Sequence, residues 1–340
     1  MFRKWGWGRA VNMLRKDGYA DLPNSTTTGW RRVSVFGTLI RHEEETISRK
    51  TDAAELAREY GLTPMGVRPP LRHYLRDVVA RREFLTVLAA SKAKAANENT
   101  YLGQIWSVLT PALNSLVYVL IFGIMLKTRA GMDNVIGFIV VGTFMYGYFS
   151  TSVTDSAKSI RSSIKLVQSL NFPRILMPMA TALKDLMVLV PGLVVMFLIA
   201  QVSVAATQGV DRLHPGRWIL LVPAVLLLAL FSSGLGFILA RMCSRMPDLV
   251  KLLPFIFRVG MYASGVIFAI QHQLAESTLR FVLEHQPVAV YLNLARQAML
   301  SERSIPLDWR FWLEGLVWGV GIFVIGVIVF WRDEARYGRD

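Results

Sequence analysis

The 340-residue sequence contains a single cysteine, Cys243, which excludes a disulfide framework and a cysteine-rich zinc site. Charged residues are also scarce: they make up 18% of the chain, whereas a soluble domain has about 25%. Apolar residues reach 53% and occur in long runs. These proportions exclude a disordered protein, a secreted disulfide scaffold and an ordinary soluble enzyme.

Several catalytic motifs are missing as well. The sequence has no G-x-x-x-x-G-K-[ST] phosphate loop, no G-x-S-x-G nucleophile elbow and no H-E-x-x-H zinc motif. The five histidines are scattered, and no D-x-D motif lies beside an apolar run, where a membrane glycosyltransferase would hold its metal. We therefore expect no catalytic, cofactor-binding or metal site in this chain.

Six apolar runs dominate what is present: 105–126, 135–151, 186–206, 218–240, 249–270 and 311–331. Each is close to the roughly 20 residues that cross a hydrocarbon core, although the second is short. We predict an all-α integral membrane protein with six transmembrane helices over 105–331. An N-terminal tail (1–70), an amphipathic helix with its linker (71–104) and a short C-terminal tail (332–340) complete the organisation.

The net charge of +14 is distributed unevenly along the chain. An even number of spans puts both ends on one side, and only eight of the 38 Lys and Arg fall in the three loops on the other side. The positive-inside rule then places both termini in the cytoplasm. The charge is a topology signal with an anionic-lipid component, so we expect no nucleic-acid partner.

The stretch 71–96 has apolar residues near helical spacing and basic residues over much of the remainder. We predict one basic amphipathic helix that lies in the cytoplasmic headgroup layer, where Arg76, Arg81 and Arg82 meet anionic lipid. The alternative is a solvated helix packed on a partner.

The external connection 271–310 is half apolar, unlike a plain hydrophilic loop. We predict that it forms two short helices that dip back into the outer leaflet, sheltered by protein.

Aromatic residues cluster in the second run, at Phe144, Tyr146, Tyr148 and Phe149, with Tyr118 in the first run and Tyr262 in the fifth. One interpretation is an interfacial aromatic belt. The other is a pore lined by aromatic rings, on which the CH faces of sugars stack while their hydroxyls reach the tyrosine OH groups.

Arg258 allows two interpretations as well. If the fifth span begins at Leu249, Arg258 lies near mid-membrane depth, where an arginine usually faces a cavity or a partner. If the span begins nearer Leu253, the side chain approaches the cytoplasmic interface instead.

Two segments carry a resemblance to a known family. Residues 97–106 (NENTYLGQIW), followed by Pro111, resemble the start of the first span in type-2 ABC exporter permeases. Residues 166–174 (LVQSLNFPR), followed by Pro178, resemble the loop between spans two and three of these permeases. The order of elements over 71–340 is similar too, most of all to the polysaccharide and teichoic-acid exporters (the Wzm, TagG and KpsM types). The C-terminal residues 331–340 resemble actinobacterial members that export a galactan.

The resemblance implies a homodimer with two separate ATPase subunits, which hold the ATP and Mg²⁺, and a lipid-linked polysaccharide as substrate. It implies that Asn171, Phe172, Pro173 and Arg174 couple the chain to the ATPase. Helix 71–96 would gate the cytoplasmic entrance, with Arg76, Arg81 and Arg82 recognising the lipid pyrophosphate. The glycan path would be lined by Tyr118, Tyr146, Tyr148, Phe149 and Tyr262, with Arg258 stabilising the passing phosphate.

Other functions remain open at this stage. The same class of permease could carry a drug or a lipid, which a narrow aliphatic lumen would favour. An ion-driven flippase would work without an ATPase partner. A membrane enzyme of polyprenyl-sugar chemistry would need metal-binding acids near one face, and the sequence shows no such group.

Overall fold

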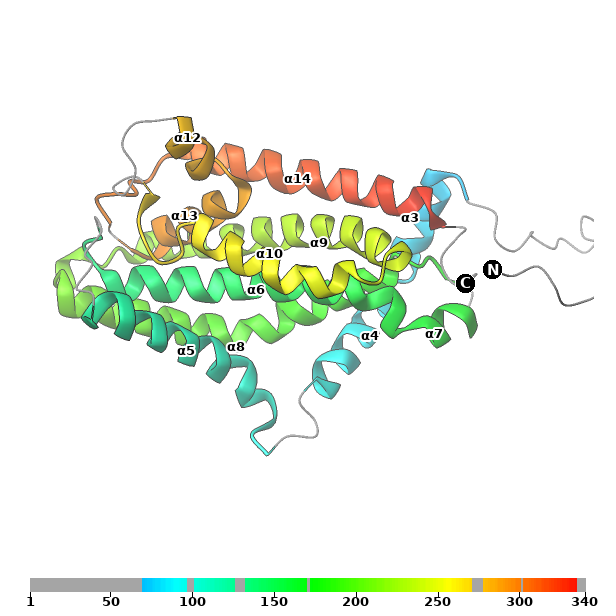
Figure 1. The fold of residues 1–340 in the computed structure, drawn as a ribbon, viewed down its shortest axis with the longest axis horizontal. Helices are drawn as coiled ribbons and strands as arrows, with labels where there is room; N and C mark the ends of the chain where they lie inside the picture. The colour runs from blue at the N-terminus through cyan, green and yellow to red at the C-terminus, as the bar shows by residue number, and fades with distance from the viewer. Residues whose placement is uncertain are drawn as a thin grey trace, which may run out of the picture. The chain divides into compact units, whose positions relative to one another are not determined.

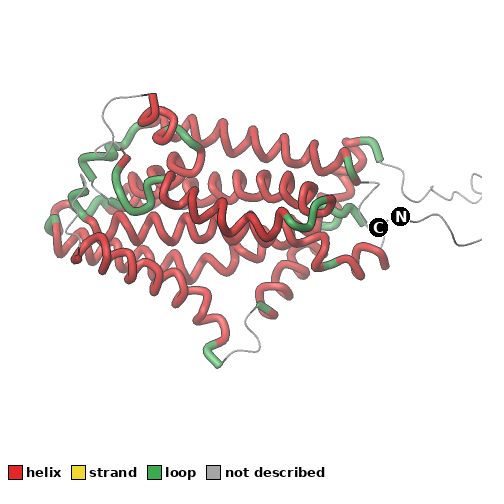
Figure 2. The backbone as a smooth tube through the Cα atoms, viewed as in Figure 1, coloured by secondary structure: helices red, strands yellow, loops and turns green. Residues whose placement is uncertain are grey.

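The computed structural model describes residues 69–96, 101–125, 132–169, 172–270, 278–300 and 302–334, which all belong to one compact unit, Gly66–Asp340. Every regular element among these residues is a helix (Figure 2). The predicted all-α class is therefore confirmed. The predicted tail 1–70 lies outside the described residues except for Pro69 and Pro70.

Five helical stretches in the described part are long and apolar enough to cross a membrane. The first, Gly103–Gly123, consists of η1 (Gly103–Ile105), α5 (Trp106–Tyr118) and most of a π-helical segment η2 (Val119–Met125). The others are α6 (Val135–Ser162), α8 (Leu176–Thr207), Pro215–Arg245, which joins η4 (Pro215–Leu220) to α9 (Leu221–Arg245), and α14 (Trp309–Arg332). The chain is thus a multi-pass membrane protein.

The helices α6 and α8 extend beyond the predicted spans. The run 135–151 becomes a helix that continues to Ser162, and the run 186–206 becomes a helix that already begins at Leu176. Between them lie the short helix α7 (Ile164–Ser169) and a turn at 172–175. The polar residues of this region, which ended the apolar runs in the sequence, therefore sit on helices. A short helix η3 (Val210–Arg212) follows α8.

The predicted fifth span is shorter than the run that suggested it. Helix α10 runs from Leu249 to Ala263 and then stops, and the chain turns at Gly265, whose φ of 67° suits glycine. Residues 266–270 stay apolar but are mostly buried in the protein. An apolar run that folds back into a core has the same composition as one that continues into lipid, so the pattern could not reveal the break.

The single helix predicted for 71–96 is two helices, α3 (Leu71–Ala80) and α4 (Arg82–Ala95). They join at Arg81, which has non-helical angles (φ −97°, ψ 23°) and whose N–H is shared between the carbonyls of Asp77 and Val78. Helix α3 buries Tyr74 and Val78 in a cluster with residues from α8, α9 and α14, whereas α4 packs along α8. The break at Arg81 lets both helices pack on this cluster while α4 continues along α8.

The external connection forms the two short helices that the sequence predicts, α12 (Thr278–Glu284) and α13 (Pro287–Met299). In α13, every residue from Ala289 to Met299 is buried, because the helix inserts among α6, α9 and α14. Helices α12 and α13 lie at one end of the bundle, which we call the α13 end; α3 and α7 lie at the opposite, α3 end (Figure 1).

A buried arginine fixes α13 in place. The Arg296 guanidinium donates to the carbonyl oxygens of Gly265 (2.9 Å), Val266 (3.1 Å) and Phe138 (3.3 Å), and it lies over the Phe138 ring. It thereby satisfies carbonyls in the turn that follows α10, since buried backbone groups need partners. The sequence analysis did not single out Arg296, because an arginine in a loop is usually exposed.

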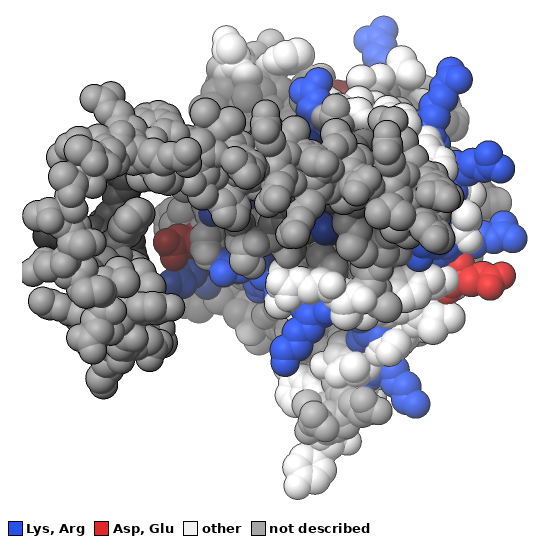
Figure 3. All heavy atoms as spheres, turned by 90° about the vertical axis from the view of Figure 1, so that its right-hand side faces the viewer, with Lys and Arg blue, Asp and Glu red and all other residues white. Residues whose placement is uncertain are grey.

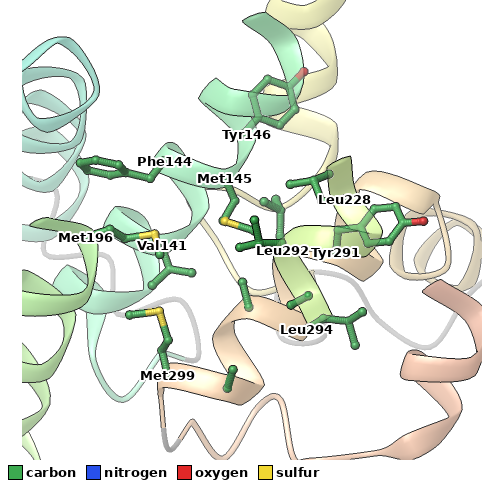
Figure 4. Close-up of a cluster of buried hydrophobic side chains, with 14 of the residues drawn as sticks. Val141, Phe144, Met145, Tyr146, Met196, Leu228, Tyr291, Leu292, Leu294 and Met299 are labelled. Atoms are coloured by element: carbon green, nitrogen blue, oxygen red, sulfur yellow. The ribbon is translucent and has the colours of Figure 1, made fainter. Parts of the chain in front are cut away.

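The core surrounds α6, whose most apolar stretch is 72% buried, against 6% for the stretch that contains α5. Side chains of α6 such as Val141 and Met145 meet Met196 of α8, Leu228 of α9 and Leu292 of α13 in one cluster (Figure 4). Helix α6 is therefore the centre of the bundle, and α5 lies at its edge.

Helices α9 and α14 approach each other through glycine. A Cβ atom on Gly234 would lie 2.5 Å from Cα of Phe323, and a Cβ atom on Gly326 would lie 2.3 Å from the carbonyl oxygen of Gly234. Neither contact leaves room for a side chain, because the neighbour is backbone. By contrast, a Cβ on Gly321, also in α14, would meet nothing within 4 Å.

We predict that Gly234→Ala destabilises the protein by about 1–3 kcal/mol through overpacking against α14. The midpoint of thermal unfolding in lipid nanodiscs measures the effect. Gly321→Ala is the matched control and should leave the midpoint unchanged. Equal midpoints for both variants would contradict the close α9–α14 contact.

Candidate functional site

A cavity of about 700 Å³ lies between α5, α6, α8 and α10. Aromatic rings and side chains that carry hydroxyl or amide groups share its wall. The aromatic residues are Trp106, Tyr118, Phe144, Tyr146, Tyr148 and Phe257; the polar uncharged residues are Ser107, Thr110, Asn114, Thr143, Ser150, Thr151 and Thr154. The wall is thus amphipathic rather than aliphatic.

The structure brings four of the predicted path residues to this cavity and separates two from it. Tyr118, Tyr146, Tyr148 and Arg258 line the wall, and α10 does begin at Leu249. Phe149 is buried in the core, where its ring contacts those of Phe231 and Phe257. Tyr262 is half exposed on α10 and does not line the cavity. Their predicted contact with a substrate remains a prediction.

Tyr146 also connects two walls of the cavity. Its hydroxyl donates to the backbone carbonyl of Phe257, so it joins α6 to α10. Gly260 stands against the same hydroxyl, because a Cβ there would lie 2.8 Å from the Tyr146 oxygen. The position of α10 beside the cavity therefore depends on this tyrosine.

One part of the wall is charged but balanced. The Lys184 ammonium of α8 lies 2.8 Å from an Asp155 carboxylate oxygen of α6 and 2.6 Å from an oxygen of its neighbour Asp185. A second ammonium, that of Lys92 in α4, donates to the Thr181 hydroxyl at 3.0 Å. Two carboxylates and two ammonium groups thus gather here. Asp155 lies beyond the predicted second span, which ends at residue 151, so the sequence did not single it out. Because α6 continues to Ser162, Asp155 faces Lys184.

The predicted coupling residues lie at the α3 end. Phe172 and Pro173 are buried, and Phe172 packs in the cluster with Tyr74 and Val78 of α3, with the Phe84 ring of α4 at 5.5 Å. Asn171 lies outside the described residues. The predicted loop and the predicted amphipathic region are therefore in direct contact.

Arg174 bonds to the C-terminal end of α14. Its backbone N–H donates to the Glu334 carboxylate (2.7 Å), and its guanidinium Nη1 donates to the backbone carbonyl of Glu334 (2.7 Å). The other carboxylate oxygen of Glu334 accepts from the Tyr74 hydroxyl at 2.8 Å. Nothing in the sequence pattern pointed to Glu334, which stands in a polar tail 160 residues from Arg174.

Arg76, Arg81 and Arg82 are exposed on α3, at the junction and on α4. Seen from the α3 end, the described surface shows many Lys and Arg and few Asp and Glu (Figure 3). This end of the bundle therefore presents a basic surface, which suits an acidic partner or anionic lipid.

Residues 83–300 match the family described as ABC-2 type transporter, and the chain therefore belongs to that family. It is similar to the O-antigen export system permease protein RfbA of Myxococcus xanthus, with 27% identity over 237 residues that cover 68% of this chain and 85% of the relative. Two proteins of the same name from Klebsiella pneumoniae are 18% and 19% identical over 76% of this chain and 94% of each relative. The chain is a membrane subunit of a transporter.

We predict that Lys184→Met destabilises the protein by about 3–5 kcal/mol, because it leaves two carboxylates without their cation inside the bundle. Thermal unfolding in nanodiscs measures the loss. Lys158→Met removes an exposed ammonium from α6 and serves as control. A triple variant that adds Asp155→Asn and Asp185→Asn should recover part of the lost stability; no recovery would contradict the charge pairing.

Proposed function

We propose that this chain is the transmembrane subunit of an ATP-driven exporter that moves a polysaccharide linked to polyprenyl pyrophosphate across the plasma membrane. The observation that carries the proposal is the cavity, whose aromatic and hydroxyl-bearing wall lies in a chain of the ABC-2 family. The similarity to O-antigen export permeases supports the same cargo class. An O-antigen, a teichoic acid and a galactan are the candidates within this class.

The chemistry of the wall suits a sugar polymer. Aromatic rings offer faces to the CH groups of a sugar, and the serine, threonine and asparagine side chains offer hydrogen bonds to its hydroxyls. Lys184 is neutralised by Asp155 and Asp185, so no strong cation holds an anion beside it. Weak contacts of this kind can be made and broken repeatedly as a polymer moves.

We infer that two copies of the chain form the pore. Helices α5 and α10 border the cavity and also expose apolar side chains such as Leu116, Phe255 and Val259. A second copy placed against these faces would enclose a path flanked by two equivalent cavities. Homodimers with twofold symmetry are the most frequent soluble oligomers, and a twofold arrangement would likewise bury the same apolar face of both copies here.

We further infer that ATP and Mg²⁺ bind to two separate ATPase subunits, which dock at the basic α3 end. That end would face the cytoplasm together with both termini, as the positive-inside rule predicts from the distribution of Lys and Arg. Phe172, Pro173 and Arg174, with Asn171 before them, would couple the chain to the ATPase. The exposed Arg76, Arg81 and Arg82 would meet the lipid pyrophosphate, because guanidinium groups suit phosphate oxygens. Arg258 would meet the phosphate farther along the path.

The first experiment is to co-express the chain with the ATPase encoded beside it and to purify the complex in mild detergent. We expect two copies of each subunit and ATP hydrolysis that accompanies glycan export. The double substitution Phe172→Ala and Arg174→Ala should lower export per ATP hydrolysed by about tenfold, because it weakens the coupling contact.

Arg310→Ala at the α13 end is the control, since Arg310 is exposed far along the chain from the coupling residues. A chain that purifies as a dimer without any ATPase would count against this function and favour an ion-driven flippase. An unchanged export ratio in the double variant would remove only the coupling role.

A second prediction concerns the cavity. Gly147 lines it, and a Cβ there would meet nothing within 4 Å, so a large side chain would extend into the empty space. Gly147→Trp should reduce glycan export by at least about tenfold by occupying the path, while assembly with the ATPase persists. Gly321→Trp places the same side chain on α14, where Cβ also meets nothing, and should export normally. Normal export by Gly147→Trp would exclude the cavity from the path.

A further inference from the structure

Glu334 joins three segments that are far apart in the sequence. Its carboxylate accepts from the Tyr74 hydroxyl of α3 at 2.8 Å and from the Arg174 backbone N–H of the 172–175 turn at 2.7 Å. Its backbone carbonyl accepts from the Arg174 guanidinium at 2.7 Å. Glu334 itself follows directly on the end of α14, and its side chain is 9% exposed.

The neighbouring residue holds this junction to the membrane bundle. Asp333 forms ion pairs with Arg241 (2.7 Å) and Arg245, both on α9, and its side chain is also buried. The Trp331 indole N–H donates to the carbonyl of Pro69, directly before α3. The C-terminal end of α14 is therefore attached to α9 by one carboxylate and to α3 and the 172–175 turn by the next.

The hydrogen bonds fix the relative orientation of the segments at this junction, which apolar packing alone does not. Phe172, Tyr74 and Val78 already pack together, but apolar contact is non-directional and allows the surfaces to slide. Bonds of 2.7–2.8 Å to a single carboxylate fix the direction and register of both donors. A displacement of the turn at Arg174 is then passed to the Tyr74 side of α3.

We propose that Glu334 is a positioning residue that transmits movement of the 172–174 segment to α3 during transport. The inference rests on the proposed function, in which that segment contacts the ATPase and α3 borders the cytoplasmic entrance. It adds the connection between the two: a carboxylate at the end of the last span, held in place by Asp333.

Burial raises the pKa of Glu334, and the hydrogen bonds from Arg174 and Tyr74 oppose the shift. Because the folded pKa lies above the unfolded value, the charge is the costlier form in the folded protein, and stability from this group is lost as pH rises through the folded pKa. A neutral amide at 334 therefore costs little stability. Its oxygen can accept from the Arg174 N–H while its nitrogen donates to the Tyr74 oxygen.

The experiment measures glycan exported per ATP hydrolysed by the full complex in proteoliposomes, together with the thermal midpoint of each variant. Tyr74→Phe keeps the buried ring and removes the hydroxyl that donates to Glu334; we expect the ratio to fall about tenfold. The ratio should fall at least as far in Glu334→Ala. In the double variant Tyr74→Phe and Glu334→Ala it should fall no further than in Glu334→Ala alone, because both substitutions remove the same contact.

Two comparisons separate transmission from simple anchoring. Glu334→Gln should restore the ratio to within about twofold of the wild type, because the amide keeps both partners. Gly234→Ala crowds α9 against α14 without changing Glu334, Arg174 or Tyr74; it should lower the thermal midpoint while leaving the ratio unchanged.

A wild-type ratio in Tyr74→Phe would overturn the inference. So would a Gly234→Ala variant whose ratio falls together with its thermal midpoint, because loss of stability alone would then explain the loss of coupling. Either result leaves the proposed export function intact. Failure of that function has its own signature, a wild-type complex that neither exports glycan nor retains its ATPase.

Discussion

The burial of α6 among α5, α8, α9, α10 and α13 is the packing constraint on which the rest of this structure depends. Asn134 starts the helix by accepting from the Gly137 N–H, and its own N–H donates to Glu302, beyond α13. At the other end, α6 extends past the apolar run and brings Asp155 to Lys184. Cavity, charge cluster and inserted helix are all positioned against this one element.

A membrane bundle leaves few ways to satisfy polar groups, and this chain uses side chains for the purpose. Arg296 donates to carbonyls in the turn that follows α10, and Lys184 pairs with two carboxylates within the bundle. At the α3 end, Asp333 and Glu334 do the same for two arginines and a tyrosine. Arg296 and Glu334 act where a helix has ended and backbone groups need other partners, because an uninterrupted helix satisfies its own backbone. Lys184 instead pairs with side chains inside two continuous helices.

The helical class, the approximate positions of the spans and the two short external helices could be predicted from apolar runs alone. The segment 172–174 was singled out by its resemblance to a loop of type-2 ABC permeases, and its coupling role stays a prediction. The break at Arg81 and the early end of α10 could not be predicted, since both depend on which surface an apolar side chain meets. For the same reason, Phe149 and Tyr146 looked alike in sequence, yet only Tyr146 lines the cavity.

By itself, the sequence determined that the chain crosses a membrane several times, that its basic residues are unevenly distributed along the chain and that it lacks a G-x-x-x-x-G-K-[ST] phosphate loop. These properties depend on composition and on the local sequence, because the free energy of transferring a segment into the membrane is close to a sum over its residues. Only the tertiary structure decided which polar residues meet. Glu334 lies 160 residues from Arg174 and 260 residues from Tyr74, and no local pattern specifies a hydrogen bond between positions so far apart.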